Sequence, residues 1–125
     1  MPRTRSVDFG VTGFGVPPPG TFEEAVRRHE SLVPDHRAAE VRAIVRSGGS
    51  WESALALAAG NAPHGSMTFR KNAGTALMTL AWDSAPFVMD VMGNHAIAER
   101  MFRHEPSAMM HAPLRTGIYR GALLP

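Results

Sequence analysis

The chain has 125 residues, enough for one domain with a modest core, and 44% of them are hydrophobic, which indicates a globular rather than a disordered protein. It contains no cysteine, which excludes disulfides, thiolate nucleophiles and cysteine-based zinc or iron–sulfur sites. Thirteen basic and eleven acidic residues give a net charge of +2 with scattered arginines, and no stretch approaches the ~20 apolar residues of a membrane span, so we expect neither nucleic acid nor a membrane as a partner.

The N-terminal residues are predicted to be extended. The first ten carry arginines but no apolar run, so no signal peptide is expected, and the composition is compatible with the cytosol. Val7, Phe9 and Val11 alternate with polar or small residues, which predicts a strand over residues 6–16. The Pro-Pro-Pro-Gly run at residues 17–20 ends this strand, because proline cannot donate a ladder hydrogen bond.

Three helices are predicted to follow. Thr21 and Glu24 have the spacing of a capping box for a helix over residues 21–33, which Pro34 ends. Asp35 is expected to cap a second helix, closed by glycines 48–49, and Ser50 a third, closed by residues 60–61. The residues expected to face inward are Val41, Ile44 and Val45 on the second helix, and Trp51, Leu55, Ala58 and Ala59 on the third.

The second half of the chain is predicted to be mainly strand. Strands are expected over residues 66–70, 75–82, 86–92 and 114–120, with hairpin-loop chemistry at residues 71–74 and a helix over residues 95–104. This order indicates a single α+β domain over residues 1–125, in which an antiparallel-rich sheet packs against helices in two layers.

Methionines are concentrated near the C-terminus, at positions 89, 92, 101, 109 and 110. Methionine fills irregular apolar gaps and adapts to varied binding partners. The cluster therefore indicates either core and dimer packing or an apolar pocket for a small ligand.

Two segments, residues 91–106 and the Ala-Pro-Leu-Arg sequence at 112–115, resemble the bacterial and archaeal family called domain of unknown function 302. That family typically shows a strand ending in Gly-Asn-Pro, a helix containing Met, an Arg-His-Asp-Pro turn and an Ala-Pro-Leu-Arg entry into the last strand. The resemblance covers about residues 62–120 and implies a compact two-layer α+β domain that forms a homodimer. It implies little about chemistry.

This chain departs from the family pattern at three positions. His95 stands where the family has proline, His111 where it has a bulky and often aromatic residue, and Glu105 where it has aspartate. Two imidazoles near the bend of the chain indicate a specialised branch.

The Gly-Asn-His sequence at residues 93–95 lies where a strand is predicted to pass into a helix. A helix N-terminus presents free N–H groups that bind anions or polarise carbonyls. His95 would act there as acid or base near pH 7, with Asn94 as an oxyanion-type donor and His111 as a further catalytic group. The alternative is structural: Asn94 caps the helix and His95 is a solvated first-turn residue.

Metal and haem sites are weaker interpretations. His95 and Glu99 share one helix face, as a base with its orienting carboxylate or as two metal ligands, and His104 or His111 would have to supply a third ligand. His104 could equally satisfy carbonyls at a helix C-terminus. Haem could use a histidine among the methionines, but there is no Cys-x-x-Cys-His sequence. We therefore expect no metal and no cofactor.

The leading hypothesis is a small-molecule-binding homodimer with a pocket beside residues 93–95. Arg115 would clamp an anionic group, or else pair with Glu99, Glu105 or Asp90. The expected substrate-binding residues are Arg115, Met92, Met101 and His104. If the protein is an enzyme, we expect a cofactor-independent dehydration, isomerisation or cyclisation of a small, largely apolar substrate.

Two alternatives remain open at this point. One is a non-catalytic homodimeric binding or assembly protein, and the other is a haem- or metal-binding protein that uses His95, His104 or His111. The leading hypothesis requires His95 and His111 to converge with the amide of Asn94 around one hollow.

Overall fold

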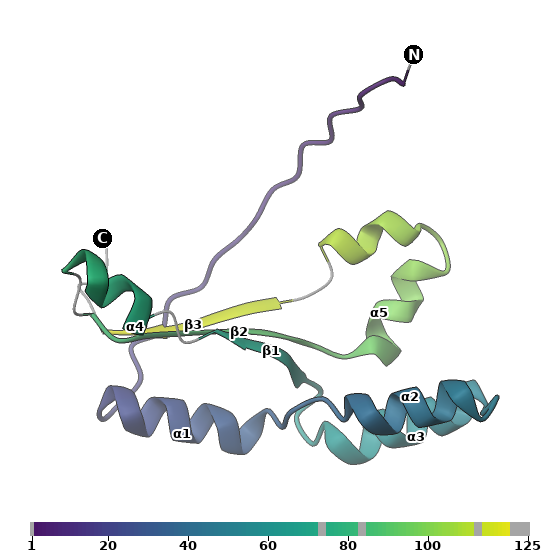
Figure 1. The fold of residues 1–125 in the computed structure, drawn as a ribbon, viewed down its shortest axis with the longest axis horizontal. Coiled ribbons are helices and arrows are strands. Elements are labelled where there is room, and N and C mark those ends of the chain that lie inside the picture. Colours follow the sequence, from purple (N-terminus) through teal and green to yellow (C-terminus); the bar gives the residue numbers. More distant parts are fainter. Residues whose placement is uncertain (1, 73–74, 83–84, 112–113, 121–125) are drawn as a thin grey trace.

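Three helices lie on one side of a three-stranded antiparallel sheet, the first along the sheet and the other two beyond its end (Figure 1). The computed structural model describes residues 2–72, 75–82, 85–111 and 114–120. In chain order the elements are α1 (Phe22–Leu32), α2 (Ala38–Arg46), α3 (Trp51–Asn61), β1 (Met67–Asn72), α4 (Thr75–Met78), η1 (Thr79–Ala81), β2 (Phe87–Gly93), α5 (His95–Phe102), η2 (Pro106–Met110) and β3 (Leu114–Tyr119). The predicted α+β class with two layers is confirmed.

The prediction of an N-terminal strand over residues 6–16 is wrong for the single chain. Residues 2–20 form no helix or strand, and they run away from the sheet with their side chains exposed (Figure 1). Val11 is 83% exposed and Phe14 is 91% exposed. Alternation describes which side of a strand is apolar, but a strand also needs a partner with free backbone groups, and this segment lies beside none.

Two of the three predicted helix caps are confirmed. The Thr21 hydroxyl accepts a hydrogen bond from the Glu24 N–H at 3.1 Å, and the Glu24 carboxylate accepts one from the Thr21 N–H at 2.9 Å. The Ser50 hydroxyl accepts from the N–H of Ser53 at 3.2 Å. Each cap uses only residues three positions apart, so the local sequence is sufficient to specify it.

The prediction that Asp35 caps the second helix is wrong. Helix α2 begins at Ala38, with Arg37 at the cap position and no side-chain capping bond. Residues 34–36 instead lie against the start of β1: the Thr68 N–H donates to the Pro34 carbonyl, and the His36 N–H to the Thr68 carbonyl, both at 2.8 Å. A backbone pairing with a residue more than thirty positions away overrides the local capping signal.

Strand β2 is the centre of the sheet. It pairs antiparallel with β1 on one side and with β3 on the other, so that Asp90 lies between Lys71 and Thr116. A bulge between Thr68 and Arg70 interrupts the register of β1. The strands predicted at residues 66–70, 86–92 and 114–120 and the helix predicted at 95–104 are confirmed with small shifts of their ends.

The strand predicted over residues 75–82 is wrong. This segment forms α4 and η1, and it ends at Trp82 in the left-handed region with φ 69°. Its alanine, leucine and methionine residues favour helix as much as strand, and short apolar runs are ambiguous by periodicity. In the predicted hairpin loop, Lys71 and Asn72 extend β1, and residues 73–74 lie outside the described residues.

The described part of the chain buries few large side chains. The buried hydrophobic residues are Ala25, Ala58 and Met67. On α3 the prediction of an inward face holds for Ala58, which is 2% exposed, but Ala59 is exposed, Trp51 is 43% exposed and Leu55 is 38% exposed. Within the described residues, no helix is long and apolar enough to span a membrane.

Candidate functional site

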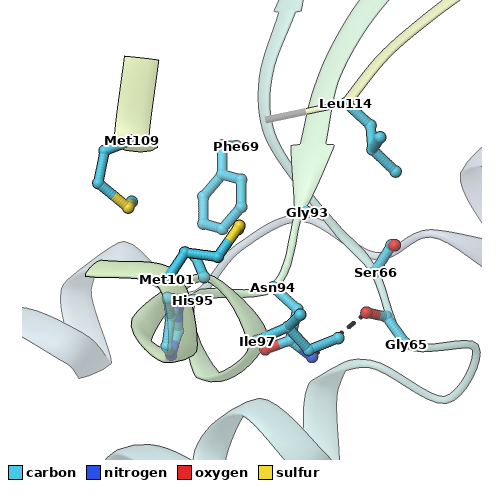
Figure 2. Close-up of a pocket in the computed structure, with 11 residues that line it drawn as sticks. Gly65, Ser66, Phe69, Gly93, Asn94, His95, Ile97, Met101, Met109 and Leu114 are labelled. Atoms are coloured by element: carbon cyan, nitrogen blue, oxygen red, sulfur yellow. Dashed lines mark hydrogen bonds between the residues drawn. The ribbon is translucent and has the colours of Figure 1, made fainter. Parts of the chain in front are cut away.

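A cavity of about 430 Å³ opens where β2 ends and α5 begins. Its apolar wall is formed by Phe69, Ile97, Ala98, Met101, Met109 and Leu114, which come from β1, α5, η2 and β3 (Figure 2). Its polar part is the backbone turn at Gly65 and Ser66 and the corner formed by residues 93–95. We call this space the α5 cavity.

Asn94 joins the two polar edges of the α5 cavity. Its side-chain oxygen accepts a hydrogen bond from the N–H of Ala96 at 2.9 Å, which caps α5. Its side-chain nitrogen donates to the carbonyl of Gly65 at 3.2 Å, the contact drawn as a dashed line in Figure 2. The capping part of the structural alternative is therefore realised, since the oxygen and the nitrogen of the amide each have a partner. These two bonds fix the position of the corner.

His95 lies in the first turn of α5 among aromatic rings. Its ring centroid is 5.6 Å from that of His36, with the planes at 76°, and 6.4 Å from that of Phe69. The rings of His36 and Phe69 are 4.8 Å apart. Among the described residues, the buried Nε2 atom of His95 has no hydrogen-bond partner. His36, Phe69 and His95 form one aromatic cluster, of which Phe69 and His95 line the α5 cavity.

The environment of His36 favours its neutral form. Burial lowers the pKa of the His36 imidazole below its usual value, and the positive charges of His95 and Arg42 lower it further. A neutral imidazole has one donor nitrogen and one acceptor nitrogen, so it can relay a proton to or from a neighbouring ring.

No pattern in the sequence indicates that His36 belongs to this site. It lies between two helices, in a segment with no periodic pattern, and it is placed by the backbone pairing of residues 34–36 with Thr68. Because that pairing is non-local, no spacing rule in the sequence could have joined His36 to His95.

A second cavity lies on the other side of His95. It has a volume of about 400 Å³ and is lined by residues of α2 and α3, including Val41, Ile44 and Trp51, together with His95. His95 is thus shared by the walls of two neighbouring cavities, which places its ring at the junction of α5 with the α2–α3 pair.

Acidification is expected to destabilise the fold through His36. Folding lowers the pKa of His36, so just below the ordinary histidine pKa of about 6.5 the unfolded chain binds a proton that the folded chain does not. The free energy of unfolding should therefore fall as the pH is lowered from about 7.5 to about 5.5. In His36→Gln this pH dependence should be shallower, as measured by urea unfolding at each pH.

The matched control for this experiment is His64→Gln, which removes an exposed imidazole from the loop before β1. It should retain the pH dependence of the parent protein. Equal slopes for the parent, His36→Gln and His64→Gln would contradict the prediction.

Of the four predicted substrate-binding residues, one lines the α5 cavity and three do not. Met101, which was expected to bind the substrate, lines the α5 cavity. Met92 is half-buried on β2, where its sulfur accepts a hydrogen bond from the Thr116 hydroxyl at 3.0 Å. His104 is exposed in the turn after α5, and Arg115 is exposed on β3. None of these last three is among the residues that line the α5 cavity.

His111 does not converge with His95. Its ring contacts that of Phe9 in the N-terminal segment, with the centroids 4.1 Å apart and the planes tilted by 48°, and it is not among the lining residues of the α5 cavity. The convergence of the two imidazoles, which the leading hypothesis required, is therefore not seen in this structure. The rest of α5, the turn after it and η2 separate the two residues along the chain.

The carboxylates considered as partners of His95 or Arg115 have other contacts. Glu99 forms a bidentate pair with Arg103, at 2.6 and 3.2 Å, and this hydrogen bonding lowers the pKa of Glu99. Glu105 accepts from the N–H of Ser107 at 3.1 Å. Asp90 lies 3.0 Å from the Nε2 atom of His29. In the described part of the chain, no three histidine or acidic side chains are grouped so as to hold a metal ion.

Comparisons with known proteins found no match to this chain among family models, curated proteins or solved structures. The resemblance to domain of unknown function 302 stays a prediction, and the functional argument depends on the geometry of the site.

Proposed function

We propose that the protein binds a small, largely apolar molecule in the α5 cavity. The observation that carries the proposal is the cavity itself, about 430 Å³ in volume with six apolar side chains on its wall. Pockets for small ligands have this size and composition, with a few polar groups that fix orientation. Here the polar groups are at the turn of Gly65 and Ser66 and at the corner of residues 93–95.

Two methionines make this wall adaptable. Met101 comes from α5 and Met109 from η2, and both are partly exposed, at 43% and 40%. An unbranched thioether can change rotamer at low cost, so the wall can close on ligands of different outline. This supports binding of an apolar molecule more than recognition of a rigid polar one.

Filling the α5 cavity is expected to abolish ligand binding. Ala98 lines the cavity from α5, and Ala98→Trp would place an indole in it. With the neutral apolar dye N-phenyl-1-naphthylamine as the probe, we expect a loss of affinity of about tenfold or more, which is about 1.4 kcal/mol of binding free energy. Fluorescence titration measures the dissociation constant.

The control is Ala39→Trp, the same substitution at an exposed position of α2 that lines neither cavity. It should bind the dye as the parent protein does, which separates the cavity from other exposed apolar surface. Equal affinities for Ala98→Trp and Ala39→Trp would refute the proposal.

Acid–base catalysis on the bound molecule is the second candidate function. The observation that favours it is that the buried Nε2 atom of His95 has no hydrogen-bond partner among the described residues and lies beside the ring of His36, whose pKa burial lowers. His95 would transfer a proton in a dehydration, isomerisation or cyclisation, with His36 as its proton partner. In this candidate, His36 takes the place that the sequence hypothesis gave to His111.

We also propose that the protein acts as a homodimer. Its accessible surface is 9929 Å², whereas a compact monomer of 13.5 kDa exposes about 6,500 Å². Apolar side chains contribute to this surface, among them Phe14, Leu80 and Trp82 at 91%, 79% and 95% exposed. Covering such residues against a second copy would recover the burial that the single chain lacks. Sedimentation equilibrium measures the mass in solution.

A further inference from the structure

The N-terminal residues have the pattern of a strand but pair with no strand in the part of the chain that the structure describes. We call residues 6–16 the N-terminal arm. Val7, Phe9 and Val11 alternate along it and are 63%, 61% and 83% exposed. The only ring contact of the arm within its own chain, among the described residues, is between Phe9 and His111. An extended apolar segment with unpaired backbone groups is a template for pairing with another sheet.

Strand β3 offers a matching edge. The order of the sheet is β1-β2-β3, so in the described part of the chain β3 is paired on one side only. The outer edge of β1 is different, because residues 34–36 already bond to Thr68 there. One face of the sheet carries exposed Tyr119 on β3 and exposed Phe87 on the neighbouring β2, with their ring centroids 6.3 Å apart.

The linker between the arm and α1 directs the arm away from its own sheet. Prolines 17–19 favour an extended, stiff conformation of about 3.1 Å per residue, and Gly20 follows them with φ 90°. Helix α1 then lies on the helical side of the sheet, while the arm leaves on the other side (Figure 1). A stiff linker of this kind favours exchange of the arm between two copies of the chain over folding of the arm back onto its own sheet.

The area balance also fits an exchanged arm. The chain exposes about 3,400 Å² more than a compact monomer of its mass. A standard protein interface takes only about 800 Å² from each partner. Exchanged arms would cover apolar surface on both copies, both at the edge of β3 and on the sheet face next to it. Because the excess exposed area is much larger than a small ligand can cover, a second copy of this chain suits the free edge better.

We propose that two copies of this chain exchange their N-terminal arms, each arm adding as a fourth strand to the free edge of β3 in the other copy. The apolar side of the arm, with Val7, Phe9 and Val11, then extends the exposed face that carries Phe87 and Tyr119. The inference rests on the homodimer proposed above and adds its mode of association.

Cross-linking between two single-cysteine variants tests the exchange, since the chain has no cysteine of its own. One variant is Val11→Cys in the arm, and the other is Arg115→Cys on β3, at a side chain that is exposed. Mixed and treated with a short bismaleimide, they should give a covalent heterodimer. Ala39→Cys, on α2, should give none with Arg115→Cys.

Each alternative has its own outcome. If Val11→Cys/Arg115→Cys in one chain yields an internal link at monomer mass and the mixed variants yield no heterodimer, the arm pairs with its own sheet and the exchange is refuted. A dimer by sedimentation without the cross-link refutes the exchange but leaves the homodimer standing. A monomer without the cross-link refutes both.

A charge in the arm provides a second test. Val11→Asp places a carboxylate on the apolar side of the arm and should weaken self-association at least about tenfold. Thr4→Asp, an exposed position before the arm, adds the same charge and should leave the dissociation constant within about twofold of the parent. Equal effects of the two substitutions would overturn the proposal.

Discussion

Asp90→Ala is expected to lower the free energy of unfolding by about 3 kcal/mol. Asp90 is 2% exposed on the central strand, and its carboxylate lies 3.0 Å from the Nε2 atom of His29, which is on α1. This pair joins the helical layer to the sheet. Removing one member leaves the other buried without its partner, which costs more than the pair contributes when intact.

The exposed pair between the same two layers is the matched control. Lys71 and Glu30 also join β1 to α1, at 2.7 Å, but both side chains are well exposed. Glu30→Ala should cost less than about 1 kcal/mol, because solvent screens the pair. Replacing both members of the buried pair, in His29→Phe/Asp90→Leu, should recover much of the loss seen in Asp90→Ala.

Urea unfolding followed by circular dichroism measures the three variants. A loss for Glu30→Ala as large as that for Asp90→Ala would show that burial of the His29–Asp90 contact does not decide its contribution. The hydrogen bond to Glu30 raises the pKa of Lys71, and the charge of Asp90 raises it to a smaller extent, so the exposed pair stays ionised at neutral pH.

Met67→Ala is expected to have a comparable effect on stability. Met67 is 1% exposed and is one of the largest fully buried side chains. It is the first residue of β1 and pairs with Gly93, the last residue of β2. Truncating a buried methionine removes its transfer energy and leaves a void, at a cost of about 3 kcal/mol. In a domain of this size the melting temperature should fall by about 10 °C.

Met110→Ala is the control for that experiment. Met110 is 76% exposed on η2, so the same substitution there should shift the free energy of unfolding by no more than about 0.5 kcal/mol. Because Gly93 borders the α5 cavity, Met67→Ala should also weaken dye binding, whereas Met110→Ala should not. Equal melting temperatures for the two variants would contradict the assignment of Met67 to the core.

The features that could be read from the sequence are those that depend on neighbouring residues. The capping box at Thr21 and the cap at Ser50 involve atoms three positions apart, and Pro34 ends a helix through its own ring. The cap at Asn94 belongs to the same class, because its oxygen bonds the N–H two residues ahead. The central and C-terminal strands followed from apolar patterns bounded by turn residues.

Other features depended on contacts between distant segments. The pairing of residues 34–36 with Thr68 cancelled the cap expected at Asp35 and placed His36 beside His95. The N-terminal residues alternate as a strand does, yet form none in a single chain, because a strand needs the backbone of another segment. The local sequence therefore determined the helix ends and most strand positions. The histidine pair and the cavity were decided by the tertiary structure, because they depend on backbone hydrogen bonds and packing between residues far apart in the chain. Neighbouring residues do not indicate such contacts.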